Sequence, residues 1–353
     1  MLESSKIGFM PNQIFELFGR SLQDESAEAM MLRHEAKCPF SNGNCDGGGN
    51  RHQTTISLRA ESKELQAFFP NLEQVIPGIC SIQSENETWL VCPRRLFAVK
   101  DNGKILLAHE LAVLEQMDFP AVTLGIWSEV NISLRDEDSS FNYHFDYVIS
   151  PVQNVELQVV KALFPDDQDL HRQLRHRSQI LIPTLEPFTI LEVMTASTSG
   201  SNKSKGTDIS SAFKNAVLGL PHTTPGINKR QVWGRMATQL FAKSACAEAW
   251  GGKTFWLLQD QFLTEIEATT RLSSEQIQQV ERTTQNNIHF TVFHVNDTTG
   301  ETTTVSNISG SAGIPFIANN PSFTGILLPK KVPSRRELLK AMLRKAPLLE
   351  VNL

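Results

Sequence analysis

Four stretches of the chain repeat apolar residues at the spacing of a helix. Three of them, residues 12–33, 104–116 and 229–250, are long enough for two or more helical turns. The fourth lies near the end of the chain, where Ser334 is followed by Glu337 and then by an apolar stripe. A serine with a glutamate three positions later is typical of a capping box. The pattern therefore predicts four helices at these places.

Other apolar runs are shorter and alternate, or are continuous over only a few residues. Glycine, proline, asparagine and serine bound most of them, which is typical of strands. The segment CPFSNGNCDGGGNRH at 38–52 carries too much glycine and asparagine to hold a helix. Helical and strand patterns are interleaved, so the sequence predicts an α/β fold. The expected strands are 76–83, 88–93, 122–126, 132–134, 141–149, 188–194, 255–258 and 288–294.

The length of 353 residues suits one large α/β domain with a smaller attachment. We expect three segments, 1–100, 101–325 and 326–353, the last with an amphipathic helix and a tail. With 40% hydrophobic and 20% charged residues, the chain has the composition of a globular protein and not of a disordered or fibrous one.

The formal net charge of -5 offers no electrostatic argument for a nucleic-acid partner. Basic residues are nevertheless clustered locally. The clusters are Arg172 with Arg175 and Arg177, Lys229 with Arg230 and Arg235, and the run 330–345.

Membrane insertion and secretion are not indicated. The chain lacks a run of roughly 18 apolar residues, and its first residues lack the layout of a signal peptide. We expect a cytoplasmic protein without a membrane partner. In that reducing compartment, cysteines serve as metal ligands or buried thiols more often than as disulfides.

Four of the five cysteines lie near turns. Six residues separate Cys38 from Cys45, and eleven separate Cys80 from Cys92; proline follows Cys38 and Cys92 directly. Four converging thiolates would form a closed tetrahedral site suited to zinc or iron. The spacing is wider than a zinc-ribbon pair, so scattered buried thiols remain an alternative. Cys246 lies within a predicted helix and is expected in the core.

Acidic residues interrupt two predicted strands. In 141–150 the alternation places the aromatic residues on one face and Asp146 on the other. Glu192 shares a face with apolar residues, where a carboxylate is costly without a partner or a metal. Glu129 precedes another strand. Such carboxylates can hold the divalent metal that phosphodiester hydrolysis needs, although strand-end acids facing water are the alternative.

Taken in order along the chain, several blocks resemble the NotI family of type II restriction endonucleases. No single block is decisive, but the ordered set covers most of residues 12–260. The blocks are ELFG at 16–19, CPF at 38–40, GIC at 78–80, WLVCP at 89–93, EVNIS at 129–133, FDY around Asp146, LEVMT at 191–195 and VWGRMATQLFAK at 232–243.

The resemblance implies a PD-(D/E)xK restriction-endonuclease-like core, a central mixed sheet flanked by helices, over 101–325. It also implies an N-terminal four-cysteine metal-binding subdomain. The implied activity is Mg²⁺-dependent cleavage of double-stranded DNA by a homodimer at a short palindrome, expected to be GC-rich. Cys38, Cys45, Cys80 and Cys92 would bind structural iron, or zinc. Asp146 and Glu192 would hold Mg²⁺, with the main-chain carbonyl of Val193, and Glu129 matches an acidic active-site position.

The sequence departs from the family at Met194, where the third motif residue is usually lysine, or glutamine. A thioether cannot orient a water as an ammonium or an amide can. Arg235, Gln239 and Lys243 follow at intervals of four on one helix face, and one of them could supply the polar group that is missing at position 194. A metal-bound water acting alone, or a slow or dead enzyme, would also account for Met194.

Basic residues near these motifs are expected to contact the phosphate backbone of DNA. The candidates are Lys203, Lys205, Lys229, Arg230 and Arg235.

Three other functions stay open at this point. One is a DNA-binding module of the same fold without activity, and another is a nuclease of the same fold that acts in repair. A redox protein that uses four thiolates around iron is the third, although it would leave the acidic strands without a task.

Overall fold

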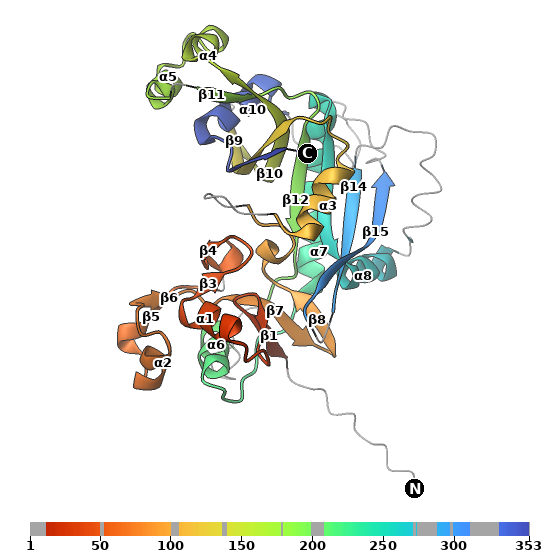
Figure 1. Ribbon diagram of the computed structural model, residues 1–353. Helices are drawn as coiled ribbons and strands as arrows, with labels where there is room; N and C mark the ends of the chain where they lie inside the picture. The colour runs from red at the N-terminus through yellow and green to blue at the C-terminus, as the bar shows by residue number, and fades with distance from the viewer. Residues whose placement is uncertain are drawn as a thin grey trace.

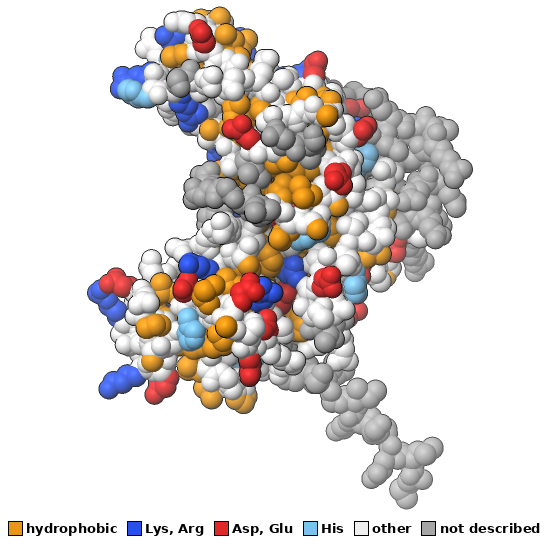
Figure 2. Space-filling model, in the orientation of Figure 1, with side chains coloured by type: hydrophobic (Ala, Val, Ile, Leu, Met, Phe, Trp, Pro, Cys, Tyr) orange, Lys and Arg blue, Asp and Glu red, His pale blue; other side chains and the backbone are white. Residues whose placement is uncertain are grey.

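The structure is a computed structural model of the whole chain. It describes residues 12–49, 53–99, 106–135, 140–177, 179–198, 208–270, 273, 288–296, 299–310 and 332–352. The N-terminal elements up to β8 gather at one end of a large sheet, and α4, α5 and α10 gather at the other end (Figure 1). Figure 2 shows a hollow in the surface between these two groups.

Residues 12–33 do not form the predicted helix. They form β1 (Gln13–Leu17), β2 (Arg20–Ser21) and, after a turn, the short helix α1 (Ala27–His34). Gly19 turns the chain with a φ of +75°, and β1 then pairs with β7 (Ile79–Ser84). Pairing with a distant strand overrides the local helical period, because it satisfies the backbone while burying Leu17 completely.

The first four-stranded sheet has the order β2-β1-β7-β8, with β8 spanning Glu87–Leu90. Both β7 and β8 lie where strands are expected. Short elements complete the N-terminal part of the chain. They are β3 (Lys37–Cys38), β4 (Gly43–Asn44), η1 (Gly47–Gly49), β5 (Ile56–Ser57), η2 (Leu58–Ala60), α2 (Lys63–Phe68), β6 (Gln74–Val75) and η3 (Pro93–Arg95).

The large sheet contains eight strands in the described part of the chain, in the order β15-β14-β13-β12-β10-β9-β16, with β11 paired to β10. The run β12-β13-β14 is parallel, and the other pairings are antiparallel. This is the mixed sheet of an α/β protein. The strands are β9 (Thr123–Arg135), β10 (Ser140–Val155), β11 (Ile180–Pro183), β12 (Thr189–Met194), β13 (Lys253–Gln259), β14 (Ile288–Val295), β15 (Thr302–Gly310) and β16 (Leu349–Asn352).

Helices cover both faces of this sheet. On one face α3 (Ala108–Gln116) packs against Leu191 and Val193. Ile190 points to the opposite face and packs with Trp250 of α7 (Lys229–Trp250). Successive side chains of β12 therefore enter two different cores, as expected for a strand buried on both sides. The remaining helices are α4 (Leu157–Leu163), α5 (Gln168–Leu174), α6 (Ile209–Val217), α8 (Asp260–Thr270) and α10 (Arg335–Lys345).

The predicted helix 229–250 coincides with α7, and the capping box at Ser334 and Glu337 opens α10. The helix expected at 104–116 is present from Ala108. Of the helices in the described ranges, none combines the length and apolar character that a membrane crossing needs.

The alternation expected for residues 141–149 is wrong. Tyr143 and Phe145 pack with α7, but Tyr147 and Ile149 pack with α3 on the opposite face. The β9–β10 pairing has the same register before and after Asp146. The expected pair of Asp146 with Glu129 is nevertheless missing from the ladder. Both strands rotate about their own axes at this point. As a result, the series of alternate side chains that faces α7 before this point faces α3 after it.

Candidate functional site

A cavity of about 860 Å³ lies between the central sheet, α7 and the N-terminal part of the chain. Residues from all three contribute to its walls, so the cavity exists only where these parts meet. The lining residues discussed below are Gly48, Arg94, Glu129, His144, Asp146, Val193, Met194, Arg235 and Gln239.

Asp146 and Glu192 lie beside each other where two strands separate. The β10–β12 ladder ends at the pair Tyr147 and Leu191. One step further, the Asp146 amide donates to Glu192 Oε1 at 3.4 Å, and the Val193 amide donates to Asp146 Oδ2 at 2.9 Å. Hydrogen bonds to the two carboxylates thus replace those of the backbone ladder. Asp146 lines the cavity, and Glu192 lies buried beside it. The structure thus brings together Asp146 and Glu192, two of the residues that the sequence predicted for the site.

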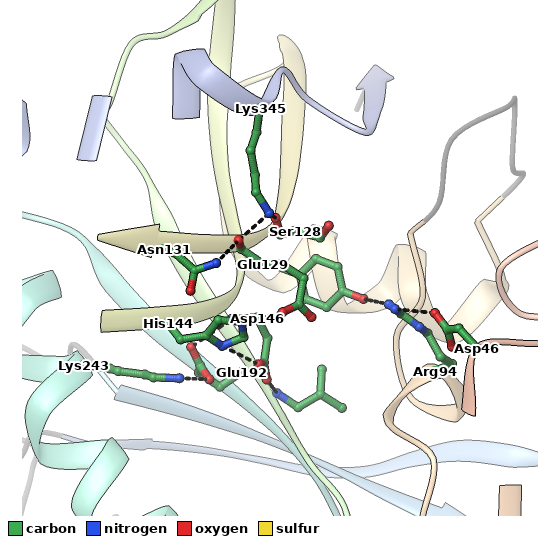
Figure 3. A network of polar contacts seen from close by, with 12 residues as sticks. Asp46, Arg94, Ser128, Glu129, Asn131, His144, Asp146, Glu192, Lys243 and Lys345 are labelled. Atoms are coloured by element: carbon green, nitrogen blue, oxygen red, sulfur yellow. Dashed lines mark hydrogen bonds and ion pairs between the residues drawn. The ribbon is translucent and has the colours of Figure 1, made fainter. Parts of the chain in front are cut away.

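Glu192 is 1% exposed, and its counter-charge comes from α7. Lys243 Nζ, itself buried, donates to Glu192 Oε2 (Figure 3). Burial raises the pKa of Glu192 well above its usual value; the charge of Asp146 raises it further, and Lys243 opposes both. A buried carboxylate between a second acid and an ammonium is the kind of group found at catalytic and metal sites.

The face of α7 that carries Arg235, Gln239 and Lys243 points toward this site. This is required if one of them replaces the lysine or glutamine that the family has at position 194. Arg235 and Gln239 line the cavity together with Met194, while Lys243 reaches Glu192 behind them. Met194 lies on the same face of β12 as Glu192, so the space that a lysine at 194 would use is close to the space that Lys243 occupies.

On the other side of Asp146, Glu129 accepts a hydrogen bond from His144 Nε2. His144 Nδ1 lies 3.9 Å from Asp146 Oδ1, so the three side chains form a row along the cavity wall. The hydrogen bond from His144 lowers the pKa of Glu129 against the opposing effect of partial burial. Sequence reasoning missed His144, which the alternation predicted for residues 141–150 places on the same strand face as Asp146.

Arg94 is a second residue that sequence reasoning missed. Its guanidinium donates to Tyr147 Oη at 3.2 Å and to Asp46 Oδ2 at 2.9 Å (Figure 3). Arg94 follows Cys92 by two positions, and Tyr147 follows Asp146 directly. These contacts connect the cysteine-containing segment with the strand that carries Asp146.

The four cysteines expected to converge do gather in one cluster, which also includes Phe40. The Gly19 amide donates to Cys80 Sγ at 3.3 Å, and the Gly47 amide donates to Cys45 Sγ at 3.5 Å. A Cβ at Gly48 would lie 2.5 Å from Cys92 Sγ, so only glycine fits there. Amide donors and a glycine turn packed against sulfur form a cradle whose soft donor set fits iron or zinc.

The positions of the four thiols in this structure are not those of a tetrahedral metal site. Among the described residues, no group of three or more His, Cys, Asp or Glu side chains has the arrangement to hold a metal ion. Cys80 and Cys92 share a hydrogen bond, which raises the pKa of Cys80 and lowers that of Cys92. Burial raises the pKa of Cys45 to about 12. Cys246 lies apart in the core beside Trp250, as expected.

The structure describes three of the five residues that were predicted to contact DNA. Lys203 and Lys205 lie outside the described residues. Lys229 pairs with Glu85 and Glu265, and its ammonium lies over the ring of Trp89, so this residue has partners within the protein. Arg230 and Arg235 are exposed on α7.

A comparison with models of protein families and a comparison with curated proteins each found no match.

Proposed function

We propose that this protein is a Mg²⁺-dependent nuclease with a PD-(D/E)xK core, acting as a type II restriction endonuclease on double-stranded DNA at a short, GC-rich palindrome. The observation that carries the proposal is the group of Asp146, Glu192 and Lys243. Two carboxylates come from adjacent strands at the point where they separate, and an ammonium lies on the more buried one. That is the set of charges that metal-assisted hydrolysis of a phosphodiester requires.

Asp146, Glu192 and the carbonyl of Val193 would hold the cation, and their oxygen donors fit Mg²⁺. Bound Mg²⁺ would supply a Lewis acid and a water of lowered pKa. The chain's own contribution is to orient these oxygens, since the Val193 amide fixes Asp146 and Lys243 fixes Glu192. Lys243 would also place an ammonium beside the attacking water, a task that Met194 cannot perform.

Two further parts of the proposal rest on the same features. The cysteine cluster would hold a structural iron or zinc ion next to the cavity, and Arg94 would connect it to β10. A homodimer would present two such cavities to a palindrome, because twofold symmetry in the protein matches twofold symmetry in the site.

The test is to incubate the purified protein with sequenced plasmid and phage DNAs in Mg²⁺ and to map the ends produced. The expected result is a set of discrete fragments that share one palindromic end sequence. Asp146→Asn, which keeps the size of the side chain, should give none. Absence of cutting by the folded, metal-loaded protein, with Mn²⁺ also, would leave an inactive DNA-binding module. Cutting at damage or junctions would indicate a repair nuclease.

A pH effect follows from the buried carboxylate. Since the pKa of folded Glu192 is raised, the folded chain binds more protons than the unfolded chain above the ordinary carboxyl range. Without a cation, its contribution to stability is therefore lost as pH rises through that raised pKa. Mg²⁺ needs the ionised form, so the rise in Tm that Mg²⁺ causes should grow with pH over the same window.

Thermal unfolding with and without Mg²⁺, followed at several pH values, measures this effect. Glu192→Gln should remove the pH dependence of the Mg²⁺ shift, because the amide does not titrate. A Mg²⁺ shift in the wild-type protein that is constant across pH would contradict the assignment of Glu192 as a ligand.

A further inference from the structure

The helical group on one side of the hollow carries a cluster of positive charge. Arg172 lies on α5, and Arg175 and Arg177 follow directly after it; all three are exposed. Lys and Arg side chains accordingly gather over α5 in the space-filling view (Figure 2). Because the whole chain has a net charge of -5, this cluster stands out from an acidic protein. We call residues 157–177, which contain α4 and α5, the α5 arm.

Packing fixes the α5 arm to the rest of the molecule. Leu170 and Leu174 point inward from α5, are completely buried and pack in one apolar cluster with Leu343 of α10. Asp167 accepts from the Leu170 amide at 3.1 Å, which caps α5, and also pairs with Lys340 of α10 at 2.5 Å. The outward face of α5 therefore has a defined position, and its arginines are held there.

The charges on that outward face are only partly compensated. Arg172 pairs with Asp169 at 2.6 Å. Arg175 donates from Nε to His176 Nε2 at 2.8 Å, a contact that brings no negative charge. Among the described residues, no carboxylate forms an ion pair with Arg175 or Arg177. Exposed guanidinium groups without a counter-charge suit an anionic partner, above all one that presents phosphate.

The N-terminal group on the opposite side of the hollow differs in this respect. Three of its basic residues, Arg20, Lys37 and Arg59, are each paired with a glutamate. Their charges are thus compensated within the protein. A polyanion that enters the hollow would find uncompensated positive charge on the α5 arm.

Strand β10 joins this arm to the candidate site. Asp146 lines the cavity, and β10 continues from it to Val155, directly before the arm. The nine residues from Asp146 to Val155 span at most about 30 Å of strand. One turn of duplex DNA is about 34 Å long. The arm therefore begins within about one turn of duplex from the cavity.

We propose that Arg175 and Arg177 of the α5 arm bind the phosphate backbone of duplex DNA beside the cleaved sequence. The inference rests on the proposed function for the identity of the DNA in the cavity. Contacts of this kind add affinity and fix the position of the duplex, but they do not read its sequence. The arm thus extends the DNA-binding surface beyond the cavity.

The experiment measures binding of a labelled duplex by fluorescence anisotropy, without added divalent cation, so that binding is separated from cleavage. The salt concentration is varied between about 50 and 200 mM. Arg175→Gln with Arg177→Gln should make the slope of log K against log salt shallower by about two, because each lost phosphate contact removes about 0.9. At ~0.1 M salt, affinity should fall about 10-fold per lost contact, on duplexes with and without the cleavage sequence alike.

Two further double variants serve as controls. Arg59→Gln with Lys253→Gln removes the same charge elsewhere, since Arg59 is paired with Glu73 and Lys253 begins β13 at the end of the sheet away from the cavity. Its slope should equal that of the wild type. Arg175→Lys with Arg177→Lys keeps both charges and should keep most of the slope. On a duplex that ends close to the cut, the glutamine variant and the wild type should bind equally.

The outcomes separate this inference from the nuclease proposal. An unchanged slope in the folded glutamine variant would overturn the phosphate contact even if the wild type cuts DNA. A lower Tm with wild-type DNA affinity would overturn it in favour of arginines that only stabilise the end of α5. Loss of affinity together with loss of a dimer in sedimentation would overturn it in favour of a subunit contact.

A wild type that binds DNA with the expected dependence on the two arginines but cuts none would end the nuclease proposal and keep the role of the α5 arm. A wild type that binds no DNA would overturn both. If the double glutamine variant does not fold, Arg177→Gln alone, which lies outside the helix, should reduce the slope by about one. No reduction would overturn the contact.

Discussion

Replacing Lys243 with methionine is expected to lower the rate constant for DNA cleavage at saturating Mg²⁺ and DNA by about 10³-fold, the usual range for losing a group that assists proton transfer or stabilises charge. The physical reason is that Lys243 is the ammonium in contact with Glu192, while position 194 offers only a thioether. Single-turnover cleavage kinetics measure the effect.

The decisive control moves the ammonium to the other element. Met194→Lys combined with Lys243→Met should recover a substantial part of the rate, because position 194 shares the strand face of Glu192. Thr238→Met, an exposed change on the same helix, should leave the rate unchanged. Since the loss of Lys243 leaves Glu192 buried without its counter-charge, circular dichroism and Tm are compared first. Full activity in folded Lys243→Met would show that a metal-bound water works without the lysine.

Replacing Cys92 with serine is expected to have the largest effect on stability. If the cluster binds iron or zinc, the binding free energy is also folding free energy, and losing one of four ligands removes several kcal/mol of it. For a chain of this size a loss of about 4 kcal/mol lowers Tm by roughly 5 °C. Elemental analysis should find about one metal ion per wild-type chain and much less in the variant.

The fifth cysteine supplies the matched control. Cys246 is fully buried like Cys92 but packs on Trp250, away from the cluster. Cys246→Ala should cost only the stability of a small core change and should keep the metal. Visible absorption from ferric thiolate would identify iron, and its absence with full metal content would indicate zinc. If the wild-type protein contains no metal and has the same Tm as Cys92→Ser, the cluster is a set of buried thiols and not a metal site.

Elements whose ends are determined locally could be predicted well. Helix α7 begins where the side chain of Asn228 accepts a hydrogen bond from the Gln231 amide, and it ends at Gly251 with a φ of +76°. Both signals lie in the sequence beside the helix. The Ser334 capping box of α10 is of the same kind. Caps act over three or four residues, so a local pattern is sufficient for them.

Elements determined by distant partners could not be predicted in this way. The apolar period of residues 12–33 resembles a helix, but β1 is made by pairing with β7 more than sixty residues away. The exchange of faces at Asp146 could not be predicted either. It coincides with a φ of 52° at Glu129, whose carbonyl accepts a hydrogen bond from Lys345, 216 residues further along the chain.

The candidate site was accessible from the sequence in part. Glu192 could be found because a charge on a buried strand needs a partner, and Lys243 because the helix face was polar. That these two residues meet depends on how α7 packs across β12. His144 and Arg94 carry no comparable signal, since an alternating histidine and an arginine after proline are common on protein surfaces.

The exchange of faces also has a consequence for when the site comes into existence. In β10, Tyr143 and Phe145 belong to the core under α7, whereas Tyr147 and Ile149, which continue the same alternation, belong to the core under α3. Asp146 therefore lies between residues that belong to different cores. Its position against Glu192 depends on the packing of both cores. A nascent or partly melted chain would lack the assembled carboxylates, so the proposed cation site would form only when both cores have folded.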